Sequence, residues 1–268
     1  MFREITIGQY YPAESRLHRL DPRVKLFATF IYLISIFVAN GIVGFAFLTL
    51  CLAIVIRMSK VPFSYMVKGL SGIVVLLIVA GLFNLFMTPG QPLVTVGPLS
   101  ISDVGLKNAL LMTARMVFLI IGTSIMTLTT TPNQLTDGLE TALKPLTLVN
   151  VPVHEIALMM SIALRFIPIL VEETDKIMKA QMARGADFET GGLIKKAKAM
   201  VPLLVPLFVS AFRRASDLAL AMEARCYNGG EGRTKMKPLC YHAWDKRAYV
   251  FVVIYFVATV CIRMFVFV

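Results

Sequence analysis

Charge is scarce in this sequence: Asp, Glu, Lys and Arg make up 16% of its 268 residues, against about 25% in soluble domains. Cysteine is also rare, with four residues and no C-x-x-C pair, which argues against a disulfide framework or a zinc ribbon. Apolar residues, in contrast, make up 57%, and the mean hydropathy is +0.74. This composition excludes disordered and fibrous proteins and predicts an integral membrane protein.

The sequence also lacks the motifs of several enzyme classes. It contains no G-x-x-x-x-G-K-[ST] and no G-x-S-x-G, so a P-loop ATPase and a serine hydrolase of that type are excluded. His154-Glu155 starts like the zinc motif H-E-x-x-H, but position 158 is Leu. The other two histidines, His18 and His242, lie far away in the sequence. We therefore predict no catalytic residue, no metal site and no cofactor bound by this chain.

Five apolar stretches approach the length of about 20 residues that a membrane-spanning helix needs. No apolar stretch of the kind found in a cleaved signal peptide precedes Val24, so the first apolar stretch is expected to remain as a span. The predicted fold class is an all-α integral membrane protein with about five transmembrane helices. Their approximate ranges are 24–39, 42–56, 69–87, a stretch within 103–130, and 249 to the C-terminus.

Lys and Arg outnumber Asp and Glu by 27 to 16, which gives a net charge of +11. Five of the basic residues precede or open the first apolar stretch, and sixteen lie in residues 131–247. Because cytoplasmic segments carry an excess of Lys and Arg, the pattern predicts a cytoplasmic N-terminus and an external C-terminus. The expected domains are transmembrane helices one to four (1–130), a cytoplasmic coupling-helix domain (131–247) and a C-terminal transmembrane helix (248–268).

Apolar residues recur every three to four positions in the segment 131–247, as in amphipathic helices. The segment as a whole is too polar to span a membrane, and three helices are expected in it. They begin at Thr131-Pro132, at Pro152 and near Leu193, and the second and third end near Gly185 and Tyr227. Each long helix has an apolar first half and a charged second half, which predicts two crossing helices at the membrane interface. A pair of ordinary re-entrant or surface helices is the alternative.

The two long helices end in similar triplets, Ala183-Arg184-Gly185 and Ala224-Arg225-Cys226. Each triplet, taken alone, is typical of a helix C-terminus, where arginine complements the helix dipole and glycine ends the helix. The duplication favours a second interpretation. Two guanidinium groups at two helix ends could dock into two similar clefts of a partner, since arginine pairs bidentately with carboxylates.

Several stretches in the same order resemble the transmembrane T component of energy-coupling factor (ECF) transporters. The segment Leu20-Asp21-Pro22-Arg23-Val24-Lys25 is similar to the L-D-P-R-x-K sequence of that family before its first span. Residues 130–140 resemble its first coupling helix, and Leu164-Arg165-Phe166-Ile167-Pro168 resembles its L-R-F-I-P stretch. The two Ala-Arg triplets lie where the family has two A-R-x signatures, with Cys226 as a departure. Together these stretches reach from the start of the first span to Cys226 and so cover most of the chain.

The resemblance implies a non-enzymatic scaffold of a bacterial, ATP-driven importer of a vitamin or other micronutrient, located in the cell membrane. Its partners would be two ATP-binding cassette ATPases, which bind the ATP and magnesium, and an exchangeable membrane S component, which binds the substrate. The residues expected to bind the ATPases are Ala183, Arg184, Gly185, Ala224, Arg225 and Cys226. The residues expected to face the S component are Met159, Met160, Ala163, Phe166, Leu204, Phe208 and Phe212.

Other interpretations stay open on the sequence alone. A self-contained secondary transporter would need paired ionisable residues at mid-membrane and repeated halves, and a membrane enzyme would need a convergent polar set inside the spans. Arg115 is either such a functional charge or a side chain near the outer interface that reaches toward water. The basic cluster Lys195-Lys196-Lys198 is expected to meet anionic lipids, and no nucleic acid is expected as a partner.

Overall fold

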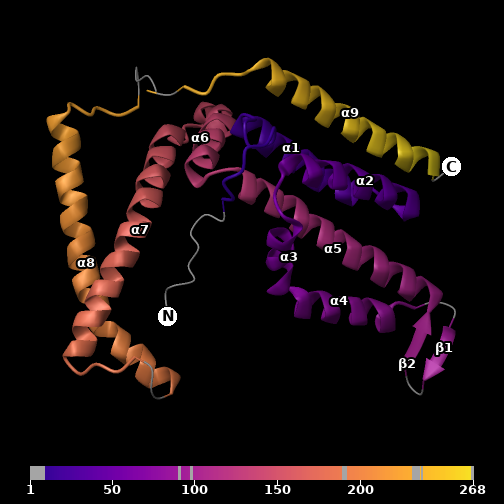
Figure 1. Cartoon of the computed structure of the whole chain (residues 1–268), viewed down its shortest axis with the longest axis horizontal. Coiled ribbons are helices and arrows are strands. Elements are labelled where there is room, and N and C mark those ends of the chain that lie inside the picture. Colours follow the sequence, from indigo (N-terminus) through magenta and orange to yellow (C-terminus); the bar gives the residue numbers. More distant parts are fainter. Residues whose placement is uncertain are drawn as a thin grey trace. The chain divides into compact units, whose positions relative to one another are not determined.

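The chain divides into two compact units in a computed structural model that describes residues 10–89, 92–96, 99–188, 192–230, 236 and 238–266. The first unit joins Gly8–Leu139 to Leu239–Val268, and the second contains Glu140–Pro238. Helices make up almost all of the regular structure that is described in both units (Figure 1). The predicted all-α fold class is therefore confirmed, apart from one short hairpin.

Four helices of the first unit match predicted spans: α1 (Pro22–Val38), α2 (Gly41–Ser59), α5 (Asp103–Thr129) and α9 (Ala243–Val266). Local capping explains where two of them begin. The carboxylate of Asp21 accepts a hydrogen bond from the N–H of Arg23, and the hydroxyl of Ser102 accepts one from the N–H of Gly105. Helix α1 packs against both α5 and α9, as Figure 1 shows.

The third predicted span, residues 69–87, is wrong in its first part. The structure has two helices here, α3 (Phe63–Ser71) and α4 (Val74–Met87), because the chain turns at Gly72 and Ile73. Glycine is a poor helix former, which favours a break at Gly72. Within the predicted span, the uninterrupted apolar helix is α4, with 14 residues. An antiparallel hairpin of β1 (Pro92–Val96) and β2 (Leu99–Ser102) follows α4, and it was not predicted from the sequence.

A close contact between α1 and α5 fixes the core of the first unit. The Tyr32 hydroxyl donates a 2.9 Å hydrogen bond to the Phe118 carbonyl, within α5. Tyr32 also lies directly on Gly122, where an added Cβ would be 2.1 Å from the tyrosine ring. Only glycine leaves room for this ring, so the two helices pack through a tyrosine on one and a glycine on the other. Leu52, Ile121 and other buried side chains fill the space beside them.

Arg115 lies near the middle of α5, about 18 Å along the axis from Asp103 at about 1.5 Å per residue. Its guanidinium group is 5.8 Å from the ring centre of Phe37 and 6.0 Å from that of Phe45. Aromatic faces attract a cation, so these rings from α1 and α2 offset part of the cost of burying this charge. The expected reach of Arg115 toward the outer interface stays a prediction.

The remaining helices lie at the predicted places, α6 at the boundary between the units and the others in the second unit. Helix α6 (Pro132–Leu143) leads into it and ends before Pro145, and a short 3-10 helix, η1 (Lys144–Val149), follows. The long helices are α7 (Val153–Ala183) and α8 (Leu193–Ala224). The predicted cap at Thr131 is confirmed, because Thr131 and Gln134 exchange backbone-to-side-chain hydrogen bonds of 3.2 and 3.3 Å.

Within the described part of the chain, four helices are long and apolar enough to cross a membrane: α2, α5, α7 and α9. Helix α4 is apolar but shorter. Helix α7 is included because it contains an 18-residue stretch of mean hydropathy 1.7. Its length and composition would allow a span, and its expected place at the membrane interface stays a prediction. The segment 131–247 is polar as a whole because charges concentrate in the second half of α7 and in α8, whereas the first half of α7 is apolar. The side chains of Lys195 and Lys196 lie outside the described part of the chain, so their expected contact with anionic lipids stays a prediction.

Candidate functional site

The C-terminal end of α7 is a Schellman motif with Arg184 as the C-cap. Gly185 follows with φ +89°, in the left-handed conformation that ends a helix. The N–H of Ala186 donates a hydrogen bond to the carbonyl of Gln181, and the N–H of Gly185 donates one to Met182, both at 3.0 Å. These bonds satisfy carbonyls of the last turn that would otherwise have no partner inside the helix.

The C-terminal end of α8 repeats this geometry with Arg225 as the C-cap. Cys226 takes the place of the glycine, with φ 56°. The N–H of Tyr227 donates to the carbonyl of Met222 at 3.0 Å, and the N–H of Cys226 donates to Glu223 at 2.8 Å. The two predicted triplets therefore form the same cap, with an arginine at the same position in each.

Both tip arginines, Arg184 and Arg225, are exposed. Neither guanidinium group makes a hydrogen bond or ion pair with another residue in the described part of the chain. Capping of the two helices uses only backbone groups and the left-handed residue, so it does not require an arginine side chain. The interpretation as ordinary C-caps thus explains Gly185, and it leaves both guanidinium groups available for a partner.

Cys226→Gly is expected to stabilise the end of α8, because a residue with a Cβ is strained by about 1 kcal/mol in the left-handed region. The matched change at the other tip, Gly185→Cys, should introduce the same strain. Hydrogen exchange of the Tyr227 amide should slow about fivefold in the first variant, since about 1 kcal/mol of local stability corresponds to that factor. Exchange of the Ala186 amide should accelerate by a similar factor in the second. Equal exchange in wild type and both variants would contradict this account of the cap.

Helices α7 and α8 are joined by a polar cluster that was not predicted from the sequence, which we call the clamp: Glu173, Ser210 and Arg214. Glu173 accepts hydrogen bonds from the Ser210 hydroxyl at 2.7 Å and from the Arg214 guanidinium at 2.8 Å. Both bonds favour the charged carboxylate. The arginine side chain is more exposed than the carboxylate, 40% against 24%, so water weakens the pair only in part.

The clamp lies at the same distance from both helix ends in sequence. Glu173 precedes Arg184 by eleven positions, and Arg214 precedes Arg225 by eleven positions. At about 1.5 Å per residue each tip is about 16 Å beyond the clamp. The C-terminal ends of α7 and α8 lie at opposite ends of the helix pair (Figure 1). Each helix therefore extends equally far from the clamp to its tip, and the two similar tips lie far apart.

The residues expected to face an S component lie on the apolar halves of α7 and α8. Most of them have exposed side chains: Met159 is 60% exposed, Phe208 62% and Phe212 71%. Met160, Ala163 and Leu204 are exposed as well, whereas Phe166 is half-buried. An apolar surface of this kind needs lipid or another protein to cover it. The structure thus leaves the predicted surface uncovered within this unit, and its occupant stays a prediction.

These features define a class: a helical membrane protein whose paired long helices present two matched basic tips and an uncovered apolar surface. The sequence matches the model of the CbiQ family, described as cobalt transport protein, over residues 13–236. The chain belongs to this family. The transmembrane protein EcfT of energy-coupling factor transporters is 55% identical in Clostridium kluyveri over 241 residues, 89% of each chain. EcfT of Bacillus subtilis is 48% identical over 255 residues, which are 95% of this chain and 96% of that one. The resemblance stated from the sequence is therefore confirmed.

Proposed function

We propose that this chain is the non-enzymatic scaffold of an ATP-driven importer and transmits movement of two ATPase subunits to a substrate-binding membrane protein. Family membership establishes a membrane component of a transporter. The observation that carries the finer proposal is the pair of matched tips with free arginines. Each tip combines an exposed guanidinium with a helix C-terminus, and each suits an acidic cleft on one of two similar subunits.

The clamp supports a mechanical role for the helix pair. Each ATPase moves one tip when ATP closes the two subunits. Helices α7 and α8 then turn about their common contact at Glu173 and Arg214. In each helix the apolar half and the tip lie on opposite sides of this contact, so the apolar halves move when the tips move. A membrane S component bound to the apolar surface is then reoriented and releases its substrate toward the cytoplasm.

The transported substrate is expected to be a micronutrient, either a vitamin or a metal ion, selected by the S component. The family description names cobalt transport, whereas the relatives are named only for energy coupling. The exposed methionines Met159 and Met160 suit a partner that binds and leaves, because flexible thioether side chains adapt to different surfaces. On this proposal the protein itself binds neither substrate nor ATP, and lipid covers the remaining apolar surface.

Secondary transport by this chain alone is the weaker proposal. It needs pairs of opposite charges inside the spans, and Arg115 instead faces two aromatic rings. The ion pairs of the described residues lie before α1, at helix starts, at the end of α6 and at the clamp, which is in the charged half of α7.

The proposal is tested by the mass of the intact complex. The tagged chain is expressed together with its neighbouring genes, purified in mild detergent and weighed by native mass spectrometry. Two ATPase subunits and one small membrane protein per copy are expected. The chain purifying alone, or with no nucleotide-hydrolysing subunit, would contradict the proposal and favour secondary transport.

A further inference from the structure

The first turn of α1 contacts two segments of the first unit: the one through which the chain leaves this unit and the one through which it returns. The chain leaves this unit after Leu139, in α6, and returns to it at Leu239. Residues Asp21–Leu26, here called the anchor segment, contact α6 on one side and the returning segment on the other. The anchor segment has the sequence Asp-Pro-Arg-Val-Lys-Leu. It belongs neither to the helix tips nor to the apolar surface, so the roles proposed for those two sites do not account for it.

The outgoing connection is held by close backbone packing. Gly138 of α6 is buried, and a Cβ at this position would be 3.0 Å from Leu26 Cδ1 and 3.2 Å from Pro22 Cβ. A larger residue would therefore push α6 away from α1. Just before α6, the Lys25 ammonium donates a 2.8 Å hydrogen bond to the carbonyl of Thr129, the last residue of α5. The anchor segment thus fixes both the end of α5 and the helix that follows it.

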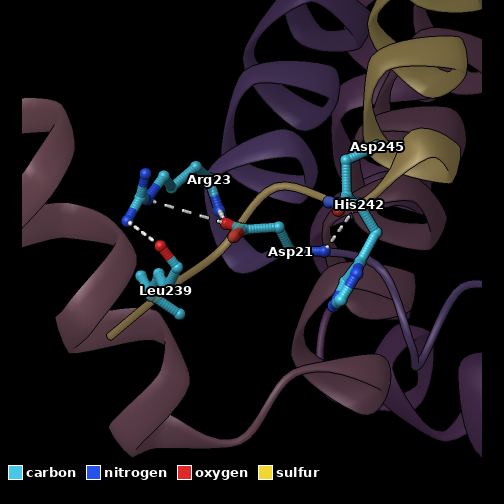
Figure 2. A network of polar contacts seen from close by, with 5 residues as sticks. All are labelled: Asp21, Arg23, Leu239, His242 and Asp245. Carbon is cyan, nitrogen blue, oxygen red and sulfur yellow. Dashed lines mark hydrogen bonds and ion pairs between the residues drawn. The ribbon is translucent and has the colours of Figure 1, made fainter. Parts of the chain in front are cut away.

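The returning connection is held by polar contacts, which Figure 2 shows. The Arg23 guanidinium donates a 3.2 Å hydrogen bond to the Leu239 carbonyl and lies 4.9 Å from the ring centre of Tyr241. The Asp245 carboxylate accepts hydrogen bonds from two backbone N–H groups, that of His242 at 2.8 Å and that of Asp21 at 2.9 Å. The bond to His242 caps the start of α9, and the bond to Asp21 ties this cap to α1.

These contacts are buried to an extent that is rare for charged groups. Asp245 is 1% exposed, and Asp21 and Lys25 are each 7% exposed. Buried charges are costly to desolvate, and their benefit lies more in fixing one arrangement than in stabilising the fold. Because the side chains of Asp245, Arg23 and Lys25 each bond to a backbone group of another segment, the network fixes where those segments run. Sliding of either connection would leave a buried charge without its partner.

We infer that the anchor segment holds both connections to the coupling helices in place, with Arg23 and Asp245 as its positioning residues. This inference rests on the proposed function. When the ATPases move the tips of α7 and α8, connections that can tilt or slide would absorb the movement in α6 and α9. Fixed connections direct the movement to the apolar surface and its bound partner. Loss of the anchor therefore uncouples transport from ATP hydrolysis without blocking either partner's binding.

The test uses the complete complex in liposomes and measures ATP hydrolysis and substrate uptake in the same vesicles. Arg23→Ala is compared with Arg19→Ala, which removes an arginine that is 77% exposed and forms an ion pair with the exposed Glu14. We expect uptake per ATP to fall at least fivefold in Arg23→Ala, with ATP hydrolysis per complex within twofold of wild type. Arg23→Lys should regain part of the uptake, because lysine can reach the Leu239 carbonyl. Equal uptake per ATP in Arg23→Ala and Arg19→Ala would overturn the inference.

A second measurement separates this inference from the proposed function. Hydrogen exchange is followed in the full chain without partners, for wild type, Arg23→Ala and Asp245→Asn. The second variant keeps the shape of the side chain. Both should speed exchange at least tenfold in peptides that cover 238–246, whereas Arg19→Ala should not. Unchanged exchange in both variants overturns the anchor even if the complex imports substrate. A wild-type complex that fails to import overturns the proposed function and leaves the exchange result to decide on the anchor.

Discussion

Reversing the charge of both tips, by Arg184→Glu with Arg225→Glu, is expected to abolish ATP-driven uptake and to leave a complex without ATPase subunits. Each single change should reduce the ATPase content to one subunit per complex. A charge-assisted hydrogen bond contributes about 1.5–3 kcal/mol. Replacement by a carboxylate adds repulsion from an acidic cleft and from the negative end of the helix dipole. The combined loss exceeds a hundredfold in binding, so the double variant retains no measurable ATPase.

The matched control for this experiment is Lys179→Glu. Lys179 is exposed on α7, five positions before Arg184, so the variant makes the same charge change on the same helix away from the tip. The ATPase content is measured by native mass and the uptake in liposomes. The control should keep both ATPases. ATPase content that is unchanged in all three tip variants would show that the arginines do not bind the ATPases.

Helix positions could be predicted from the sequence because their causes are local. The starts of α5 and α6 follow from Ser102 and Thr131, whose side chains cap the first turn. The end of α7 follows from Gly185, because glycine adopts the left-handed conformation of this cap without strain. The turn at Gly72 was missed because apolar residues continue on both sides of it, so hydropathy alone gives no boundary there. The hairpin after α4 was missed because its alternating runs, Val94–Val96 and Leu99–Ser102, are too short to stand out beside the apolar spans.

Contacts between distant segments could not be predicted. Asp245 looks like an ordinary residue in the first turn of a helix, yet it accepts a hydrogen bond from Asp21, 224 positions away. Glu173 looks like part of a solvated face, as does its neighbour Glu172. One signal for the clamp was present in the sequence: Glu173 and Arg214 have the same separation along the chain as the two tip arginines. That repeat aligns the two helices but does not say which residues touch.

Substitutions at the clamp are expected to affect the coupling of uptake to ATP hydrolysis rather than the binding of the ATPases. Glu173→Arg should place two like charges where an ion pair of 2.8 Å was, and Arg214→Glu should do the same with opposite sign. We expect each variant to lower uptake per ATP about tenfold while both ATPases stay bound, because the tips are intact. The swapped double variant restores an ion pair. For a partly exposed pair it should recover about 1–2 kcal/mol of interaction and uptake within threefold of wild type.

Glu172→Arg is the matched control for the clamp, since Glu172 is an exposed neighbour on α7 and undergoes the same charge change. It should leave uptake per ATP within twofold of wild type. If the helices merely lie side by side, the swapped variant will behave as the sum of its two single variants, and the proposed turning point is wrong. Recovery in the swapped variant requires that Glu173 and Arg214 act on each other. A contact at the same distance from both tips then transmits equal movement from two ATPases to one membrane partner.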